Sequence, residues 1–503
     1  MIGQYVCNNE KKAIRAFEIM PGVIIWSIIL FPVLGSFVAP RLVSYFIIGF
    51  NVYWLYRSLK LTVYGLRGYT KIKHSEEEDW YTRYTREKTK KFLNWEDIWH
   101  VVIIPTIAPK EPLEVVSANI DALANQTLDT SQMIVVLAME QRVEGSKEAA
   151  EILLDRYQAK FGHMWAPFHP DNLVGEVVGK ASNMAWAGKE SRKKLSELGI
   201  DLDYVTLTSC DADGQFHYKY FEALTYEFAK NPRRYRRFWQ SPIFWYNNIW
   251  EVPAFTRIIG ILGNIIHISD LQDPSHLFFN YSCYSTSYKM IDEVGYWDTD
   301  IIPEDWHIFL QSFFFCEGKV EVLPIFLPTS VDAPEGKTYF KSLVNRYKQC
   351  KRHAWGASDI PYAMMQFFKH PEIPITERVL RVFKLVESHV LWSTNWFLIT
   401  LGANLPPLLN PAFAQTTLGQ NLMDVSQTLL AFSLLGLATV ILLDGALRPP
   451  RPENVKWWQL PAHYLQWFLM PIATLLMATL PGLDSHTRLM LGKRLEYWVT
   501  EKM

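Results

Sequence analysis

Apolar runs that are long enough to cross a membrane gather at the two ends of the chain. No charged residue occurs between Glu18 and Arg41, and Val23–Val38 is dense in Ile, Val, Leu and Phe. A bilayer-spanning helix needs about 20 apolar residues, so this run predicts one. A second run, Leu42–Tyr56, reaches spanning length if Arg57 and Lys60 extend toward the headgroups and the helix continues to Leu66. Three more runs lie near the C-terminus: His389–Leu405, Val425–Leu443 and Trp457–Leu480. Five runs at the two ends favour membrane helices over buried core helices.

The pattern changes between about Trp95 and Ile373, where no spanning run is expected. Short apolar runs of strand length alternate there with helical patterns. The strand candidates are Val101–Pro105, Met133–Ala138 and Tyr204–Thr208, and the helix candidates are Leu113–Leu123, Ala149–Lys160 and Phe216–Lys230. This alternation predicts an α/β domain with a mainly parallel sheet covered by helices on both faces. Ligands of such sheets bind beyond the carboxyl ends of the strands, so the polar residues that follow the strands are the candidate site.

The chain is therefore expected to have three parts. Residues 1–70 form an N-terminal membrane region with two transmembrane helices. Residues 95–380 form the α/β domain, and residues 381–503 form a C-terminal membrane region with two or three transmembrane helices. The N-terminal run reads as a retained signal anchor rather than a cleaved signal peptide, because Phe37-Val38-Ala39-Pro40 makes a poor cleavage site and a second apolar run follows at once.

The loop charges predict an orientation. Basic residues precede the first run and follow the second, namely Lys11, Lys12 and Arg15, then Arg57, Lys60, Arg67, Lys71 and Lys73. The positive-inside rule then puts the N-terminus and the α/β domain in the cytoplasm, which indicates a multi-pass protein of a plasma or inner membrane. A fifth crossing would leave four basic residues outside, namely Arg488, Lys493, Arg494 and Lys502. The number of crossings, four to six, therefore stays open.

Composition narrows the class of protein. The 503 residues include 50 basic and 51 acidic side chains, so no broad field of one sign favours nucleic acid as a partner. Hydrophobic residues make up 49% of the chain, which excludes disorder as its main state. The 5 cysteines are widely spaced and form no CxxC pair, which argues against a disulfide framework or a zinc ribbon.

Two acidic motifs carry the first candidate chemistry. Asp211 and Asp213 follow the third strand candidate, and two carboxylates at such an exit can share Mg²⁺ or Mn²⁺ while diphosphate oxygens complete the shell. The alternative is a solvated turn. Glu304 and Asp305 open the apolar helix Ile308–Phe315, where the helix dipole lowers carboxylate pKa values. There an acidic residue can act as a general base toward an attacking hydroxyl, although helix capping is an alternative.

A third motif combines cations and an indole. Gln349, Arg352 and Trp355 lie within one short segment, and a guanidinium with a nearby indole can bind phosphate and stack on a sugar. The alternative is a basic helix that touches lipid headgroups. Glu140 after the second strand candidate, and Lys180 with Asn183 further on, are weaker signals, because single residues of these types usually lie on the solvated surface.

The order of these motifs resembles that of the family 2 glycosyltransferases. Pro105-Thr106, an acidic residue, Lys180, the DAD motif, the ED motif and QxxR follow one another over about Trp95–Gly356. The likeness is greatest to the membrane-integrated members, the group of cellulose, chitin and hyaluronan synthases. It implies a GT-A (Rossmann-like) cytosolic catalytic domain flanked by transmembrane α-helices. It also implies an inverting, metal-dependent transfer of a sugar from a nucleotide-diphosphate sugar to a lipid-linked or polysaccharide acceptor beside membrane lipids.

The resemblance also implies roles for individual residues. The residues that would bind the nucleotide sugar are Thr106, Glu140, Lys180, Asn183 and Asp211. Asp211 and Asp213 would hold the metal, which would be Mg²⁺ or Mn²⁺, and Asp305 would be the catalytic base. The acceptor and the diphosphate would contact Glu304, Trp306, Gln349, Arg352 and Trp355.

Two positions depart from the family pattern. Glu140 stands where Asp is usual, and His353 follows Arg352 where polymer-forming members have Trp. Single-sugar transfer is therefore about as well supported as processive synthesis and extrusion of a polysaccharide. Three aromatic residues before the ED motif are acceptor-site candidates or core, namely Tyr281, Tyr284 and Trp297. Different-class alternatives are a non-catalytic membrane scaffold or transporter component that retains the fold, and a nucleotidyl- or phosphotransferase, which the absence of a GxxxxGK[ST] loop disfavours.

Overall fold

The computed structural model describes residues 2–171 and 173–495. The predictions for Lys502 and for the last eight residues of the C-terminal region lie outside the described residues. All five cysteines are free, as their spacing predicts.

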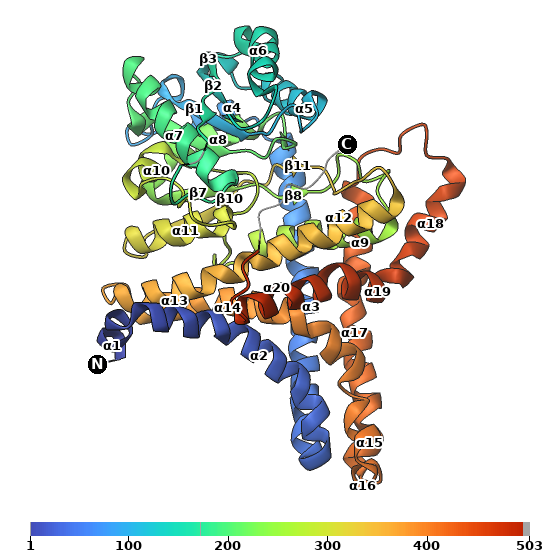
Figure 1. Ribbon diagram of the computed structural model, residues 1–503. Helices are drawn as coiled ribbons and strands as arrows, with labels where there is room; N and C mark the ends of the chain where they lie inside the picture. The colour runs from blue at the N-terminus through green and yellow to red at the C-terminus, as the bar shows by residue number, and fades with distance from the viewer. Residues whose placement is uncertain (1, 172, 496–503) are drawn as a thin grey trace.

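A mixed sheet forms the centre of the α/β domain (Figure 1). Its strand order is β10-β7-β9-β5-β1-β2-β3, with β4 also paired to β2. β1 pairs in parallel with both β2 and β5, whereas β9 runs antiparallel to β5 and β7. The strands are β1 Trp99–Pro105, β2 Met133–Glu140, β3 His163–Trp165, β4 Phe168–His169, β5 Val205–Ser209, β7 Arg237–Gln240, β9 Tyr284–Ser287 and β10 Glu321–Pro324. The predicted parallel-rich α/β architecture is confirmed.

Continuous apolar strands place this sheet between two cores. Val101 and Ile103 of β1 join one core, while Val102 and Ile104 join the other, because successive strand residues point to opposite faces. Helices α7 Lys180–Glu197, α10 Tyr288–Val294 and α11 Glu304–Phe315 cover the first face. Helices α5 Leu113–Ala124, α6 Ser146–Tyr157 and α8 Tyr220–Lys230 cover the second. The three strands and three helices expected from the sequence all form, with ends shifted by a few residues.

One predicted helix start is wrong for a local reason. Phe216 was expected to begin a helix, but β6 Gln215–Phe216 pairs antiparallel with β11 Thr329–Ser330. α8 therefore begins at Tyr220. The second, three-stranded sheet has the order β6-β11-β8, with β8 at Ile243–Phe244. This second sheet brings the DAD motif, which lies just before β6, next to the loop that follows β11.

Four helical stretches among the described residues are long and apolar enough to cross a membrane. They are α2 Glu10–Val38, α9 Ala254–Leu271, α17 Thr417–Leu447 and the broken stretch Trp457–Met490, which contains α18 Leu460–Leu465, α19 Met470–Thr474 and α20 Leu480–Met490. Three correspond to predicted runs. α9 contradicts the expectation that residues 95–373 hold no such segment, although 61% of its apolar window is buried inside the protein.

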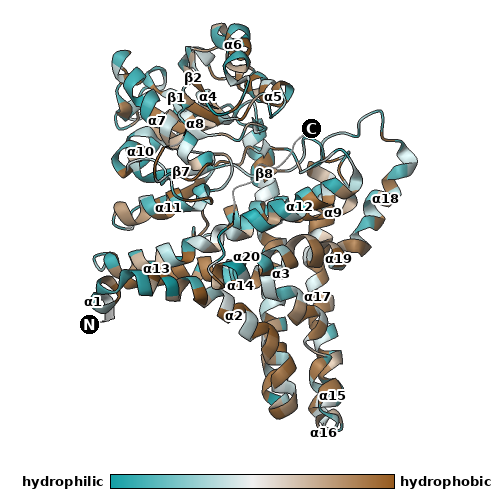
Figure 2. Cartoon of the chain, in the orientation of Figure 1, coloured by the Kyte–Doolittle hydropathy of each residue, from teal (hydrophilic) through white to brown (hydrophobic). Residues whose placement is uncertain are grey.

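The other two predicted runs form long helices that are not among these four. α3 Pro40–Glu77 and α14 Ile375–Leu401 hold them. Both helices carry charged groups that pair with each other, since Arg57 Nη1 lies 3.1 Å from Glu387 Oε1. Ionisable residues in a membrane-spanning helix are tolerated when they pair inside a helix bundle. Figure 1 shows α12 Tyr339–Ala354, α13 Asp359–Lys369 and α20 lying between the sheet domain and the apolar helices that Figure 2 colours brown.

Candidate active site

The carboxyl ends of the three central parallel strands meet at one edge of the sheet. Thr106 follows β1, Glu140 ends β2, and Asp211 comes two residues after β5. Backbone bonds hold these exits together, since Thr106 N–H donates to Ala138 O at 3.1 Å and Cys210 N–H donates to Ile103 O at 3.0 Å. A cavity of about 360 Å³ opens at this edge.

Most of the residues that the sequence singled out line this cavity. They are Thr106, Glu140, Lys180, Asn183, Asp211, Asp213, Glu304, Asp305, Trp306, Gln349 and Arg352. Trp355 does not line it. This indole begins the 3₁₀ turn after α12 and packs in the core under the sheet, only 6% exposed. Of the three aromatic acceptor candidates, Tyr281 lines the cavity, whereas Trp297 Nε1 donates to Tyr284 Oη at 2.9 Å inside the core.

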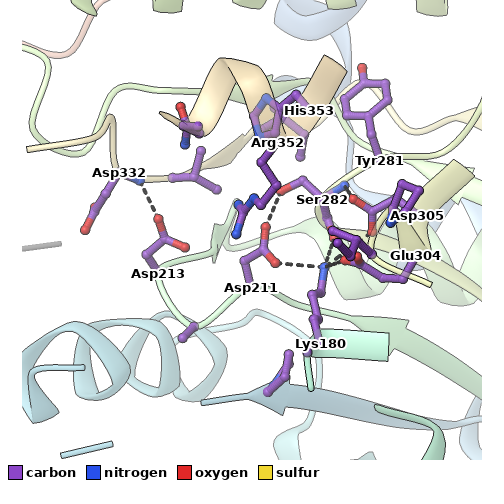
Figure 3. A pocket seen from close by; sticks show the side chains of 18 of the residues that line it. Lys180, Asp211, Asp213, Tyr281, Ser282, Glu304, Asp305, Asp332, Arg352 and His353 are labelled. Carbon is purple, nitrogen blue, oxygen red and sulfur yellow. Dashed lines mark hydrogen bonds and ion pairs between the residues drawn. The ribbon is translucent and has the colours of Figure 1, made fainter. Parts of the chain in front are cut away.

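Lys180 joins the two acidic motifs. It is the first residue of α7, and its ammonium lies 2.8 Å from Asp211 Oδ1, 2.8 Å from Glu304 Oε1 and 3.3 Å from Asp305 Oδ1. Figure 3 shows these carboxylates arranged around the ammonium at the floor of the cavity. The four charged groups come from three separate elements, namely the β5 exit, the start of α11 and the start of α7. The cation offsets the repulsion that these clustered carboxylates would otherwise exert on one another.

Burial and neighbouring charge set the proton affinities here. Burial raises the pKa of Asp305 well above its usual range, Glu304 raises it further, and Lys180 lowers it. Burial lowers the pKa of Lys180, but Asp211, Asp305 and Glu304 outweigh that effect and keep this pKa well above its ordinary value. Lys180 is therefore a permanent cation at neutral pH, and Asp305 is a carboxyl group poised to take a proton.

Two backbone amides complete the site, and no sequence pattern indicates either of them. Ser282 N–H donates to Asp305 Oδ2 at 2.8 Å, and its hydroxyl donates to Asp211 Oδ2 at 2.6 Å. Ser282 has a left-handed backbone (φ 56°), which turns both groups toward the carboxylates. The N–H of Asp332, in the loop after β11, donates to Asp213 Oδ2 at 2.8 Å. Backbone donors of this kind carry no residue-type signature, so only the fold reveals them.

Some predicted binding residues also make local structural contacts. Asn183 Nδ2 donates to Ala138 O at 2.7 Å and so fastens α7 to β2. Thr106 Oγ1 donates to Glu111 Oε2 at 3.0 Å, and Arg346 donates to Gln349 Oε1 at 2.6 Å. Burial raises the pKa of Glu140, while Arg142, which donates to this carboxylate at 2.9 Å, lowers it.

The carboxylate oxygens in the cavity suit a hard divalent cation that takes only some of its ligands from the protein. Among the described residues, no group of three or more His, Cys, Asp or Glu side chains could hold a metal ion by itself. Asp211 and Asp213 offer carboxylate oxygens from one loop, and Figure 3 shows Arg352 extending toward them across the cavity. Mg²⁺ and Mn²⁺ take oxygen ligands and commonly fill their shell from substrate phosphates. The residues present thus fit a cation that arrives together with a diphosphate.

Several aromatic side chains also line the cavity. Trp245, Tyr281, Trp306 and Trp392 line it, the last of them from α14. The imidazole of His267 stacks on Tyr281 with ring centres 4.2 Å apart. Aromatic faces beside hydrogen-bonding groups can pack against the apolar face of a ring-shaped ligand.

Comparisons with known proteins give distant structural likenesses. No protein-family model matches the chain, and no curated protein sequence matches it. The structure is similar to a mannosyltransferase from Pyrobaculum calidifontis solved in complex with GDP-Man and Mn²⁺, with a TM-score of 0.42 and 10% identity over 88% of this chain and 100% of that chain. It is also similar to S. aureus TarS 1–349 in complex with UDP-GlcNAc, with a TM-score of 0.33 and 10% identity over 71% of this chain and 95% of that chain. At these TM-scores neither likeness assigns a fold family or an activity to this chain.

Proposed function

We propose that the protein is a membrane-bound, inverting glycosyltransferase of GT-A fold. It transfers a sugar from a nucleotide-diphosphate sugar to a lipid-linked or polysaccharide acceptor. The supporting observation is the convergence of Asp211, Glu304 and Asp305 on the Lys180 ammonium within one cavity at the carboxyl edge of the sheet. A transferase that ejects an anionic diphosphate needs a cation-holding group and a base within the same small volume, and these motifs supply both.

The donor side carries the negative charge of the leaving group. Asp211 and Asp213 would hold Mg²⁺ or Mn²⁺, which when bound neutralises charge as the diphosphate departs. Arg352 faces the same region, and a guanidinium matches phosphate geometry (Figure 3). Thr106, Glu140 and Asn183 line the part of the cavity next to β1 and β2, where the nucleoside binds in this proposal.

Asp305 acts on the acceptor side. It removes the proton from an acceptor hydroxyl while that oxygen attacks the anomeric carbon on the face opposite the diphosphate. The new bond joins the acceptor oxygen to the anomeric carbon, the bond from that carbon to the phosphate oxygen breaks, and the proton stays on Asp305. A single displacement of this kind inverts the anomeric configuration. Burial raises the pKa of Asp305, and a higher pKa makes the ionised carboxylate a stronger base.

The acceptor approaches from the membrane side in this proposal. Trp392 belongs to α14, one of the long helices beside the apolar bundle, and it lines the cavity together with Tyr281 and Trp306. Those rings suit a sugar already attached to a lipid or to a growing glycan. Single transfer and polymer synthesis share this chemistry. The length of the product made from a radiolabelled donor separates the two.

The donor and metal requirement is testable with purified protein in detergent. A screen of nucleotide-diphosphate sugars with Mn²⁺ is expected to find one donor that supports transfer or hydrolysis, and EDTA is expected to remove that activity. Asp213→Asn is expected to reduce kcat/KM about 10² to 10³-fold, because a lost charge-stabilising group in such a site costs that much. Asp155→Asn, on the exposed surface of α6, is the matched control. Equal activity of Asp213→Asn and wild type would remove the assigned metal role.

The orientation in the membrane is testable by labelling. We propose that the α/β domain is cytosolic and that the 410–421 segment, which includes the first turn of α17, lies outside. An impermeant maleimide is then expected to label Asn421→Cys in intact cells and Lys90→Cys only after permeabilisation; both positions are exposed in the structure. The reverse labelling pattern would invert the proposed topology.

A further inference from the structure

A buried histidine lies between two carboxylates directly behind the ED motif. His307 sits in the first turn of α11, two residues after Asp305, and is 3% exposed. Its Nδ1 lies 2.8 Å from Asp359 Oδ1, and its Nε2 lies 2.9 Å from Asp298 Oδ2. Asp359 is the first residue of α13, and Asp298 lies in the loop before α11.

When both carboxyl groups are ionised, this geometry requires a charged imidazole. Burial raises the pKa of Asp359, while the charge and hydrogen bond of His307 lower it. A neutral imidazole has one N–H and one acceptor nitrogen, so it cannot donate to two carboxylates at once. Asp359 is 1% exposed, and its Oδ2 has no hydrogen-bond partner among the described residues, so His307 is the group that compensates this buried charge. Burial lowers the pKa of His307, but Asp359 and Asp298 outweigh it and raise the value to about 9.

The contact joins two segments that both line the cavity. α11 carries Glu304, Asp305 and Trp306 into the site. α13 follows without a break from the turn after α12, the helix that carries Gln349 and Arg352. His307 therefore fastens the base-bearing helix to the arginine-bearing segment, and it does so from outside the cavity, because its own side chain does not line it.

We propose that His307, held between Asp298 and Asp359, is a positioning residue. It keeps the Asp305 carboxylate and the segment that carries Arg352 in the relative position that transfer needs. The inference rests on the proposed glycosyltransferase function. It concerns a contact that has no part in binding donor or metal. Loss of the imidazolium proton breaks one of the two hydrogen bonds and leaves two carboxylates facing an uncharged ring, which loosens the first turn of α11.

The sign of the pH dependence follows from the groups that face the ring. Asp298 approaches from the preceding loop, Asp359 and Tyr362 approach from α13, with the Tyr362 ring centre at 4.3 Å, and Glu304 lies on the same helix. The pKa of His307 in the folded protein is raised above the ordinary 6.5. Both hydrogen bonds of His307 to Asp298 and Asp359 are therefore present below pH 6.5 and are lost as pH rises through about 9. Transfer is thus expected to fall on the alkaline side.

The test measures kcat and donor KM against pH for the full-length protein in detergent. Wild type is expected to lose kcat above about pH 9 with little change in donor KM. His307→Gln is expected to lower kcat about 10 to 100-fold at pH 7, because a small displacement of reacting groups costs that much, and to lack the alkaline limb. Asp298→Asn removes one of the two charges and is expected to move that limb down by about one pH unit.

His100→Gln is the matched control. His100 is also fully buried in the α/β domain, but it bonds to Thr206 and Thr225 hydroxyls instead of carboxylates. It is expected to leave the alkaline limb where wild type has it. Asp298 is partly exposed, so Asp298→Asn is expected to fold and provides the test if His307→Gln does not fold. An unchanged alkaline limb in folded His307→Gln or in Asp298→Asn would overturn the role of His307 and leave the proposed function standing. Absence of wild-type activity with every donor would overturn the proposed function and, with it, the role of His307.

Discussion

Asp305→Asn is expected to abolish sugar transfer while the protein still inserts into the membrane and binds donor. Asn keeps the size of the side chain and an oxygen that can accept the Ser282 N–H bond, which is 2.8 Å long in the wild type. It removes the group that takes the proton. General-base catalysis contributes about 10² to 10⁴-fold, so kcat is expected to fall by about that factor. Turnover of the donor identified by the screen, measured at saturating Mn²⁺, checks the value.

Two comparisons make the Asp305 result specific. Binding of the nucleoside diphosphate is expected to stay within a few-fold of wild type, because Asp305 faces the acceptor side in the proposed mechanism. Glu304→Gln removes the neighbouring carboxylate, which also contacts Lys180, and is expected to lower kcat by a smaller factor than Asp305→Asn. Full activity of Asp305→Asn would show that the base is another residue, and a larger loss in Glu304→Gln would name it.

The strand-and-helix pattern of the α/β domain was readable from the sequence because its central strands are buried on both faces. β1 and β2 are nearly continuous apolar runs, and each is followed by a helical repeat with an apolar face. The carboxyl ends of parallel strands must share one edge, so the grouping of Thr106, Glu140 and Asp211 followed directly. α9 was missed because Asn264, His267 and Asp270 interrupt its apolar pattern.

Other parts of the site depend on contacts that no local pattern encodes. Ser282 and Asp332 contact the site through backbone N–H groups, which every residue type except proline offers. His307 lies in an apolar helix and looks like a core histidine until Asp298 and Asp359 are brought to it from other elements. Trp355 was expected beside the acceptor, but α12 ends at Ala354 and the following turn directs this indole into the core. Its assigned role in binding has no contact in the cavity to support it.

Lys180→Met is expected to reduce transfer about 10² to 10³-fold near pH 7. The substitution leaves Asp211, Glu304 and Asp305 clustered without the cation that contacts all three. Lys180 lowers the pKa of Asp305, so its removal raises that pKa and leaves the base protonated over a wider pH range. The acid limb of the pH–rate profile is therefore expected to move to higher pH, and activity is expected to recover in part as pH rises. The profile of kcat measured with a fixed donor concentration above KM checks this.

The direction of that pH shift separates two roles for the lysine. If Lys180 served only to grip the nucleotide, Lys180→Met would raise donor KM and leave the acid limb of kcat unmoved. A counter-ion that spans both acidic motifs shifts the limb even when donor is saturating, because the charge it supplies acts on the base itself. Lys193→Met, on the exposed side of the same helix, removes an equal charge 13 residues further along and is expected to change neither quantity. An unmoved acid limb in Lys180→Met would limit the role of Lys180 to nucleotide binding. The pKa of Asp305 would then be set by burial, Glu304, Asp211 and the Ser282 N–H group.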